Sequence, residues 1–171
     1  MLRSLAVVGA IVVALVILNY RAPQDPVREV DADALAQQVA TVAPYPVLLP
    51  TDPGWRPTAA RWEPTAESEP AEVWFVAGVY AAEGPFASLS QSAAASPEFI
   101  AAATGDGAPV DSVVVGEVQW QHYESLDGDR SLLLADPQYV AIVAGSGTWE
   151  DLERFAGSLA PVSGDSGQAA G

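Results

Sequence analysis

The sequence contains no cysteine, no lysine and a single histidine. The absence of cysteine excludes a disulfide-stabilised scaffold, a thiol nucleophile and a cysteine-based zinc site. A single histidine also excludes a metal site built from several histidine ligands. The seven basic residues, all arginine, are outnumbered by 22 acidic ones, which gives a formal net charge of −15 at pH 7. A chain this acidic repels phosphate, so we expect no nucleic-acid partner.

The longest hydrophobic run lies at the amino end, where Leu5–Leu18 comprises 14 residues that are all apolar apart from one glycine. Flanking residues extend it to roughly 17, the lower limit for a helix that spans a bilayer. Arg3 and Arg21 bound the run, as is typical of a membrane helix. A cleaved signal peptide is the alternative, but Ala22, the nearest small residue, is followed by proline. We therefore predict an uncleaved transmembrane anchor over residues 1–21.

The charges are unevenly distributed about this predicted anchor. Everything beyond residue 21 contains five arginines and all 22 acidic residues, a formal net charge of −17. The arginines near the anchor are almost evenly divided between its two sides, so the positive-inside rule does not decide the orientation. A short amino tail with a translocated acidic domain is the usual arrangement. We expect a single-pass protein of the cell membrane, with lipid around the helix and the domain outside the cytoplasm.

The chain of 171 residues is long enough for one domain of ordinary size. Beyond the anchor we predict three segments: a linker with a short helix at 22–43, an α+β domain at 44–160 and a disordered tail at 161–171. The short helix is expected over Ala34–Val42, capped by Asp31 or Asp33. Glycine, serine and alanine dominate the tail, which has no apolar periodicity.

Strand patterns dominate the predicted domain. Alternating or continuous apolar residues predict strands at 57–63, 72–80, 86–91, 113–115, 117–123, 132–135 and 139–144. Asp127-Gly128 is a strong hairpin turn, while Ser96-Pro97 and Thr148 mark helix starts. The class is therefore α+β, an antiparallel sheet packed by two or three short helices. The order of elements also allows a duplicated unit, a β-meander followed by one helix.

Five segments, taken together, resemble a known family. They are Met1–Leu5, Pro44–Leu48 followed by Gly54–Arg56, Phe86–Ser92, Trp120–Glu124 and Gly145–Leu152. In this order they are similar to the actinobacterial membrane family named domain of unknown function 4245. The resemblance covers the chain from the anchor to Leu159. It implies a single-pass membrane protein with an extracytoplasmic α+β domain, and it implies no activity.

His122 is the one residue that could serve a Ser–His–Asp site. Strand alternation places it beside Val118 and Trp120 on the apolar side of its strand. The sequence also lacks a Gly-x-Ser-x-Gly nucleophile elbow. We therefore predict a buried structural histidine.

The acidic and glycine-rich motifs have simple structural explanations. Asp127-Gly128-Asp129 lacks the alternating acids of a calcium loop, so a hairpin turn accounts for it. Gly105-Asp106-Gly107 and Gly145-Ser146-Gly147 lack the lysine of a phosphate-binding loop. A helix is expected to follow Gly145-Ser146-Gly147, and Thr148 is expected to accept hydrogen bonds from the free N–H groups at its start. Four further acids lie in a proline-containing loop between strands: Glu63, Glu67, Glu69 and Glu72. We predict a solvated loop, and weak calcium binding is the alternative.

Five tryptophans in a small domain suggest a platform for carbohydrate or peptide. Trp74, Trp120 and Trp149 lie at positions that suit burial. Trp55 and Trp62 flank a proline-rich loop and are the better surface candidates, although packing within the fold explains most such residues.

No residue is assigned a catalytic, cofactor-binding or metal-ligating role, and no cofactor is expected. The anchor and the acidic domain favour a non-enzymatic module that binds an envelope protein or a wall polymer. Two alternatives remain open. One is a cell-envelope hydrolase whose carboxylates meet in a cleft, and the other is an accessory subunit that acts through its transmembrane helix.

Overall fold

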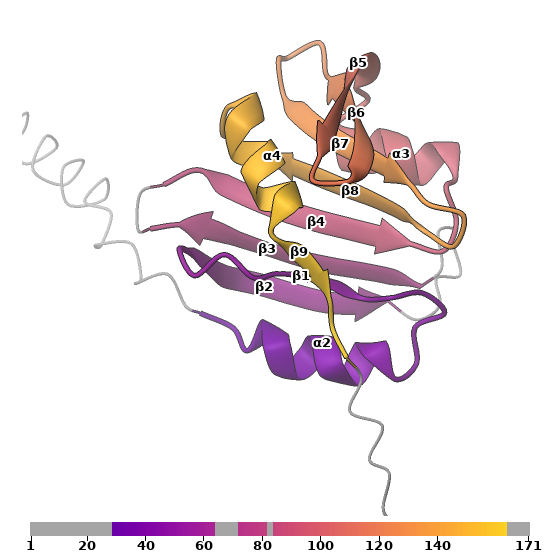
Figure 1. Cartoon of the computed structure of the whole chain (residues 1–171). Coiled ribbons are helices and arrows are strands. Elements are labelled where there is room, and N and C mark those ends of the chain that lie inside the picture. Colours follow the sequence, from indigo (N-terminus) through magenta and orange to yellow (C-terminus); the bar gives the residue numbers. More distant parts are fainter. Residues whose placement is uncertain (1–28, 64–71, 82–83, 164–171) are drawn as a thin grey trace, which may run out of the picture.

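A computed structural model describes residues 29–63, 72–81 and 84–163 (Figure 1). The elements, in chain order, are α2 (Ala32–Ala40), β1 (Leu48–Pro50), β2 (Trp55–Glu63), β3 (Val73–Tyr80), β4 (Phe86–Ser92), α3 (Pro97–Thr104), β5 (Ala108–Val115), β6 (Val118–Glu124), β7 (Arg130–Ala135), β8 (Val140–Gly145), α4 (Trp149–Gly157) and β9 (Leu159–Pro161). In these ranges, every helix is too short or too polar to cross a membrane. The predicted anchor at 1–21 lies outside them.

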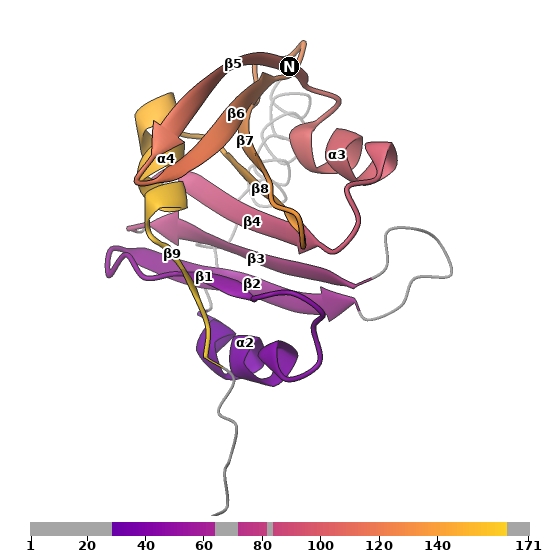
Figure 2. The same ribbon diagram turned by 45° about the vertical axis from the view of Figure 1, so that its right-hand side comes forward.

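The strands form two antiparallel sheets, which confirms the α+β class. Seven strands are ordered β2-β3-β4-β8-β7-β6-β5, and β1 pairs with β9 in a separate two-stranded sheet. Two meanders therefore meet where β4 pairs with β8, which at first suggests the duplicated unit. However, the second half contributes four strands, and α3 and α4 lie on opposite faces of the sheet (Figures 1 and 2). A two-fold axis relating β4 to β8 would place both helices on one face, so the helices depart from a duplication.

One face of the large sheet, here called the α4 face, carries the main core. Successive side chains of a strand point to opposite faces of the sheet, so every second residue of a strand reaches this core. Trp74, Leu89, Leu132 and Val143 are fully buried there against Phe155 of α4. The opposite α3 face has a smaller core, in which Phe99, Leu133, Val140 and Ile142 pack together.

Both ends of the predicted domain extend further than the sequence indicated. Helix α2, which we assigned to the linker, buries Ala32, Ala36 and Val39 in the main core. Asp31 caps it by accepting a hydrogen bond from the Ala34 N–H. At the other end, strand β9 includes Pro161, the first residue of the predicted tail, which pairs with Leu48 of β1. The remainder of the tail from 164 lies outside the described residues.

The small β1–β9 sheet is joined to the large sheet by side chains instead of a backbone ladder. Gln91 is fully buried, and its Oε1 accepts a hydrogen bond from the Leu48 N–H at 2.8 Å. Its Nε2 donates to the carbonyl of Pro46 at 3.2 Å. The Trp74 indole Nε1–H donates to the Leu48 carbonyl at 3.0 Å. Buried backbone groups of β1 are thereby satisfied without a neighbouring strand.

Tyr45 adds a second connection just before β1. Its hydroxyl donates to the Glu72 carbonyl at 2.6 Å and accepts from the Trp74 N–H at 3.2 Å. Burial raises the pKa of Tyr45 well above its usual range, so the hydroxyl stays protonated and remains a donor.

We expect Gln91→Leu to lower the free energy of unfolding by about 1–3 kcal/mol, because the buried Leu48 N–H loses its acceptor. Urea unfolding measures this change. Gln121→Leu, at an exposed position of β6, is the control and should change stability by about 0.5 kcal/mol or less. Equal effects of the two substitutions would show that the Gln91 bonds do not hold β1.

Candidate functional site

His122 lies in β6, where a bulge in the neighbouring strand surrounds it with carboxylates. The pairing of β5 with β6 shifts between Pro109 and Ser112, so Val110 and Asp111 both lie opposite His122. The Asp111 carboxylate contacts His122 Nδ1 at 2.5 Å. On the other side, Glu153 of α4 places Oε1 3.3 Å from Nε2. The imidazole thus lies between two carboxylates.

The ring also packs against Trp149, with the two ring centres 4.1 Å apart and nearly parallel. Arg130 lies near the same indole, its Cζ 5.6 Å from the ring centre. His122 is only 8% exposed, which confirms the predicted burial. Nδ1 is paired with Asp111, whereas Nε2 is buried near Glu153 without forming a hydrogen bond among the described residues. The cluster connects β5, β6 and α4 through these side-chain contacts.

The predicted turn at Asp127-Gly128-Asp129 is present. The Ser125 N–H donates to the Asp129 carbonyl, the Gly128 N–H donates to Ser125, and Gly128 has a φ of +84°. Among the described residues, no group of three or more potential ligands could hold a metal ion. Of the four glutamates of the predicted loop, Glu67 and Glu69 lie outside those residues. Glu63 forms an exposed ion pair with Arg61.

The Gly145-Ser146-Gly147 segment precedes α4, and the start of that helix is already occupied. Asp151 Oδ2 accepts hydrogen bonds from both the backbone N–H and the hydroxyl of Thr148. Thr148 Oγ1 in turn accepts from the Asp151 N–H, which completes a capping box. The helix N-terminus therefore has its own anion, and Thr148 acts as the sequence predicted. Gly105-Asp106-Gly107 ends α3, with Gly105 as its left-handed cap.

The tryptophan predictions are mixed. Trp74 and Trp120 are buried as expected, and Trp149 and Trp62 are half-buried. Trp55, one of the two surface candidates, is instead buried, as packing within the fold predicted, because β2 begins at this residue and directs it onto the α4 face. Its indole lies over Gly78, where a β-carbon would come within 2.6 Å of the ring. Its edge meets Phe155 at 5.6 Å between ring centres.

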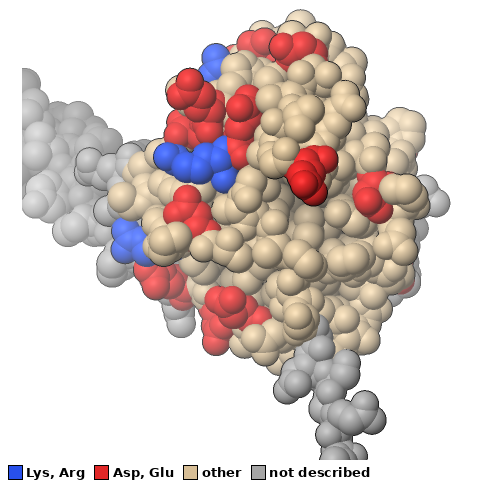
Figure 3. All heavy atoms as spheres, viewed as in Figure 1, with Lys and Arg blue, Asp and Glu red and all other residues tan. Residues whose placement is uncertain are grey.

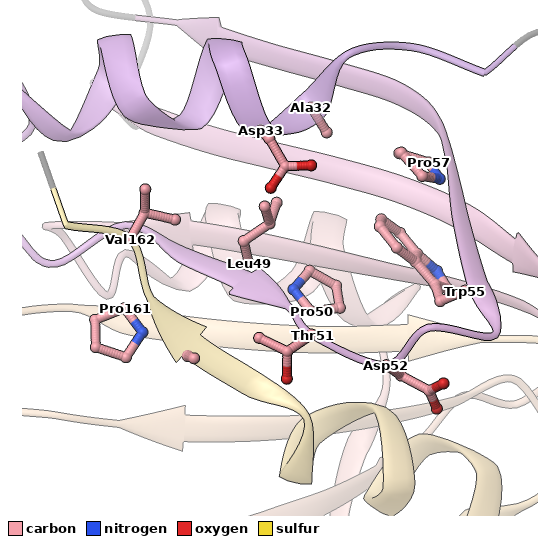
Figure 4. Close-up of a pocket in the computed structure, with 11 residues that line it drawn as sticks. Ala32, Asp33, Leu49, Pro50, Thr51, Asp52, Trp55, Pro57, Pro161 and Val162 are labelled. Atoms are coloured by element: carbon pink, nitrogen blue, oxygen red, sulfur yellow. The ribbon is translucent and has the colours of Figure 1, made fainter. Parts of the chain in front are cut away.

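Trp55 nevertheless forms part of a groove that the sequence did not predict (Figure 4). The groove, here called the α2 groove, has a volume of about 450 Å³ and lies between the start of α2, the β1–β9 sheet and the start of β2. It is lined by Ala32, Asp33, Leu49, Pro50, Thr51, Asp52, Trp55, Pro57, Ala160, Pro161 and Val162. These residues come from both ends of the domain, so no local pattern marks them as neighbours.

Two carboxylates lie in the wall of the α2 groove. Figure 4 shows Asp33 directed from α2 toward Leu49, and Asp52 on the loop after β1. Asp52 Oδ1 accepts a hydrogen bond from the Gly54 N–H at 2.8 Å. No arginine lines the groove, and neither carboxylate has an ion-pair partner in the part of the chain that the structure describes. Acidic side chains are also spread over the surrounding surface (Figure 3). The groove lining therefore carries two acidic side chains and no basic one.

A family model described as "Protein of unknown function (DUF4245)" matches residues 1–159. The chain belongs to the DUF4245 family. This confirms the resemblance inferred from the five sequence segments. No curated protein and no solved structure matches the chain. Because the description of the DUF4245 family assigns no activity, the match by itself implies none.

The capping box of this DUF4245 protein predicts a pH-dependent contribution to stability. Hydrogen bonds from the Thr148 N–H and hydroxyl, reinforced by Arg154, hold the pKa of Asp151 below its usual range. A carboxyl whose pKa is lower when folded stabilises the protein above its unfolded pKa. That contribution disappears as the pH falls through the folded pKa.

We therefore expect Asp151→Asn to lower the free energy of unfolding by about 1 kcal/mol near neutral pH. The difference in the free energy of unfolding between this variant and the unmodified chain should shrink as the pH falls below the usual pKa range of aspartate. Urea unfolding at several pH values measures it. Glu150→Gln, in the same turn but outside the capping box, is the control and should have a smaller effect. If the loss of stability in Asp151→Asn stays the same in acid, the ionised Asp151 carboxylate is not its cause.

Proposed function

We propose that this protein is a non-enzymatic binding module, anchored to the membrane by residues 1–21 and exposed outside the cytoplasm. Its α2 groove would take an extended, positively charged segment of another envelope protein. The observation that carries the proposal is the combination, in one groove, of apolar walls with two carboxylates that lack a cation.

The walls favour a protein segment over a wall polymer. Leu49, Pro50, Pro161 and Val162 present aliphatic and proline side chains, and Thr51 supplies the one hydroxyl in the lining. Sugar chains need several hydrogen-bonding partners, whereas aliphatic and proline side chains of a peptide pack on such walls. A volume of about 450 Å³ suits a few side chains of an extended segment instead of a folded partner.

The electrostatics favour a basic segment. Asp33 lies in the first turn of α2 and Asp52 on the opposite side of the groove, so an arginine or lysine between them would meet two acceptors. The acidic surface around the groove would also raise the local concentration of a basic partner and its association rate.

A hydrolase remains the alternative, because these two carboxylates face a shared groove as an acid pair does in glycosidases. Burial of one acid is what usually keeps it protonated for catalysis. Asp33 is exposed, which favours a binding role for it. The low exposure of His122, 8%, also supports a non-enzymatic role.

Photocrosslinking in native membranes tests the proposal. The photoreactive residue p-benzoylphenylalanine replaces Pro161, in the groove, or Ala135, an exposed position on β7. We expect the Pro161 position to give a discrete adduct whose captured segment, identified by mass spectrometry, carries net positive charge. The Ala135 position should give none.

The charge requirement is tested with paired substitutions in the Pro161 crosslinking chain. We expect Asp33→Asn with Asp52→Asn to reduce the adduct about tenfold or more. Asp106→Asn with Asp127→Asn removes the same charge outside the groove and should leave the adduct unchanged. A neutral or acidic captured segment, or equal effects of both pairs, would refute the proposal. Release of sugar from cell-wall fragments that disappears in Asp52→Asn would favour the hydrolase instead.

A further inference from the structure

The neutral ring of His122 has one proton too few for the two carboxylates that face it. Nδ1 contacts Asp111 of β5, and Nε2 lies 3.3 Å from Oε1 of Glu153 of α4. Nε2 is buried and forms no hydrogen bond within the described residues. A neutral imidazole carries a proton on one nitrogen alone, so the other nitrogen turns a lone pair toward a carboxylate. Protonation makes both nitrogens donors, and each carboxylate then faces an N–H.

The charges around the ring are mainly negative. Besides the two carboxylates in contact with the ring, Glu124 follows two residues later on β6 and lies on the same side of that strand. Strand β7 contributes Arg130, whose Cζ lies 5.6 Å from the ring centre of Trp149. The indole of Trp149 stacks on His122, and an aromatic face attracts a cation. A proton added at Nε2 therefore enters a region with more negative than positive charge.

Helix α4 connects this cluster to the α2 groove. Glu153 lies in the middle of α4, and the chain passes from the C-cap Ser158 directly into β9. Residues 160–162 then line the groove. The Ser158 carbonyl also accepts hydrogen bonds from the Thr51 N–H at 2.9 Å and from the Thr51 hydroxyl at 2.8 Å, and Thr51 is a groove residue too. A displacement of α4 is therefore transmitted to the groove wall by two routes.

We propose that His122 is a proton-operated latch on α4, which holds the groove wall when the ring is protonated and loosens it when the ring is neutral. A proton from solvent binds Nε2, the new N–H donates to Glu153, and Nδ1 keeps its contact with Asp111. The Glu153 side chain is 30% exposed, so water reaches the cluster from that side. Imidazole groups usually titrate between about pH 5 and 8. The latch regulates the groove, so its role in binding rests on the function proposed above.

The first test follows the ring itself, whose signals are unambiguous because the sequence has one histidine. The full-length ¹⁵N-labelled chain is titrated in detergent micelles, and the NMR shifts of the two ring nitrogens report protonation. We expect the amide signals of Thr51, Ala160 and Val162 to shift with the same midpoint as the ring.

Hydrogen exchange gives the direction of the effect. A group that gains a partner on protonation stabilises the folded state at the lower pH. Protection factors of the Leu152 and Phe155 amides in α4 should therefore be about fivefold higher near pH 5.5 than near pH 8, because a charge-assisted hydrogen bond is gained.

Two substitutions in α4 assign the effect to one carboxylate. Glu153→Gln supplies an amide that can donate to the neutral Nε2, so the pH dependence of the α4 protection factors and of the groove signals should disappear. Glu150→Gln removes the same charge at an exposed position of α4 and should leave both unchanged. A ring that keeps one protonation state between about pH 5 and 8 would overturn the proposal. So would groove signals that stay still while the ring titrates, and the unmodified chain decides both points even if a variant does not fold.

Crosslinking separates the latch from the binding function. With p-benzoylphenylalanine at Pro161, we expect about threefold more adduct near pH 5.5 than near pH 8, and no such difference when Glu153→Gln is added. An adduct whose yield is equal at the two pH values would refute control of the groove by His122. Groove signals that follow the ring without any adduct would support the latch and refute the binding function alone.

Discussion

The structure depends on the hydrogen bonds that Gln91 and Trp74 make with strand β1 and with Pro46 just before it. Strand β1 has a backbone ladder only with β9, so without these bonds its inner edge would present unpaired groups to an apolar layer. A glutamine carries both a donor and an acceptor, and it can therefore satisfy an N–H and a carbonyl of the same segment. Because Gln91 is fully buried, its hydrogen bonds are strong, and losing one of them would destabilise the fold.

The α2 groove follows from this arrangement. The bonds hold β1 and β9 above the large sheet, and α2 lies beside them with its alanine-rich side in the core. The space left between these three elements is the groove, and its walls are the proline and aliphatic side chains that end the short strands. Asp33 and Asp52 lie there because one belongs to the first turn of α2 and the other to the loop after β1. The groove is thus a consequence of how the small sheet is supported.

Several features of the fold were predictable because neighbouring residues determine them. The Thr148 capping box, the Ser96 helix start and the Asp127-Gly128 turn all involve residues within a few positions of each other. Strand alternation likewise predicted the burial of Trp120 and His122, and a nearly continuous apolar run predicted that of Trp74. The extended reach of β5 and the existence of β9 were not predictable, because exposed residues with a proline give β5 no alternating pattern, and β9 is a strand only through its partner β1.

The sequence by itself determined the α+β class, the helix caps, the turn and the exclusion of cysteine and multi-histidine sites, since these follow from composition and short-range geometry. Tertiary structure alone decided which carboxylates meet. Asp111 and Glu153 reach His122 through a bulge and a helix that lies on the sheet, and Asp33 reaches the groove from the opposite end of the domain to Pro161. The physical reason is that strand register and helix placement are set by the packing of distant side chains, and a local pattern carries no information about that packing.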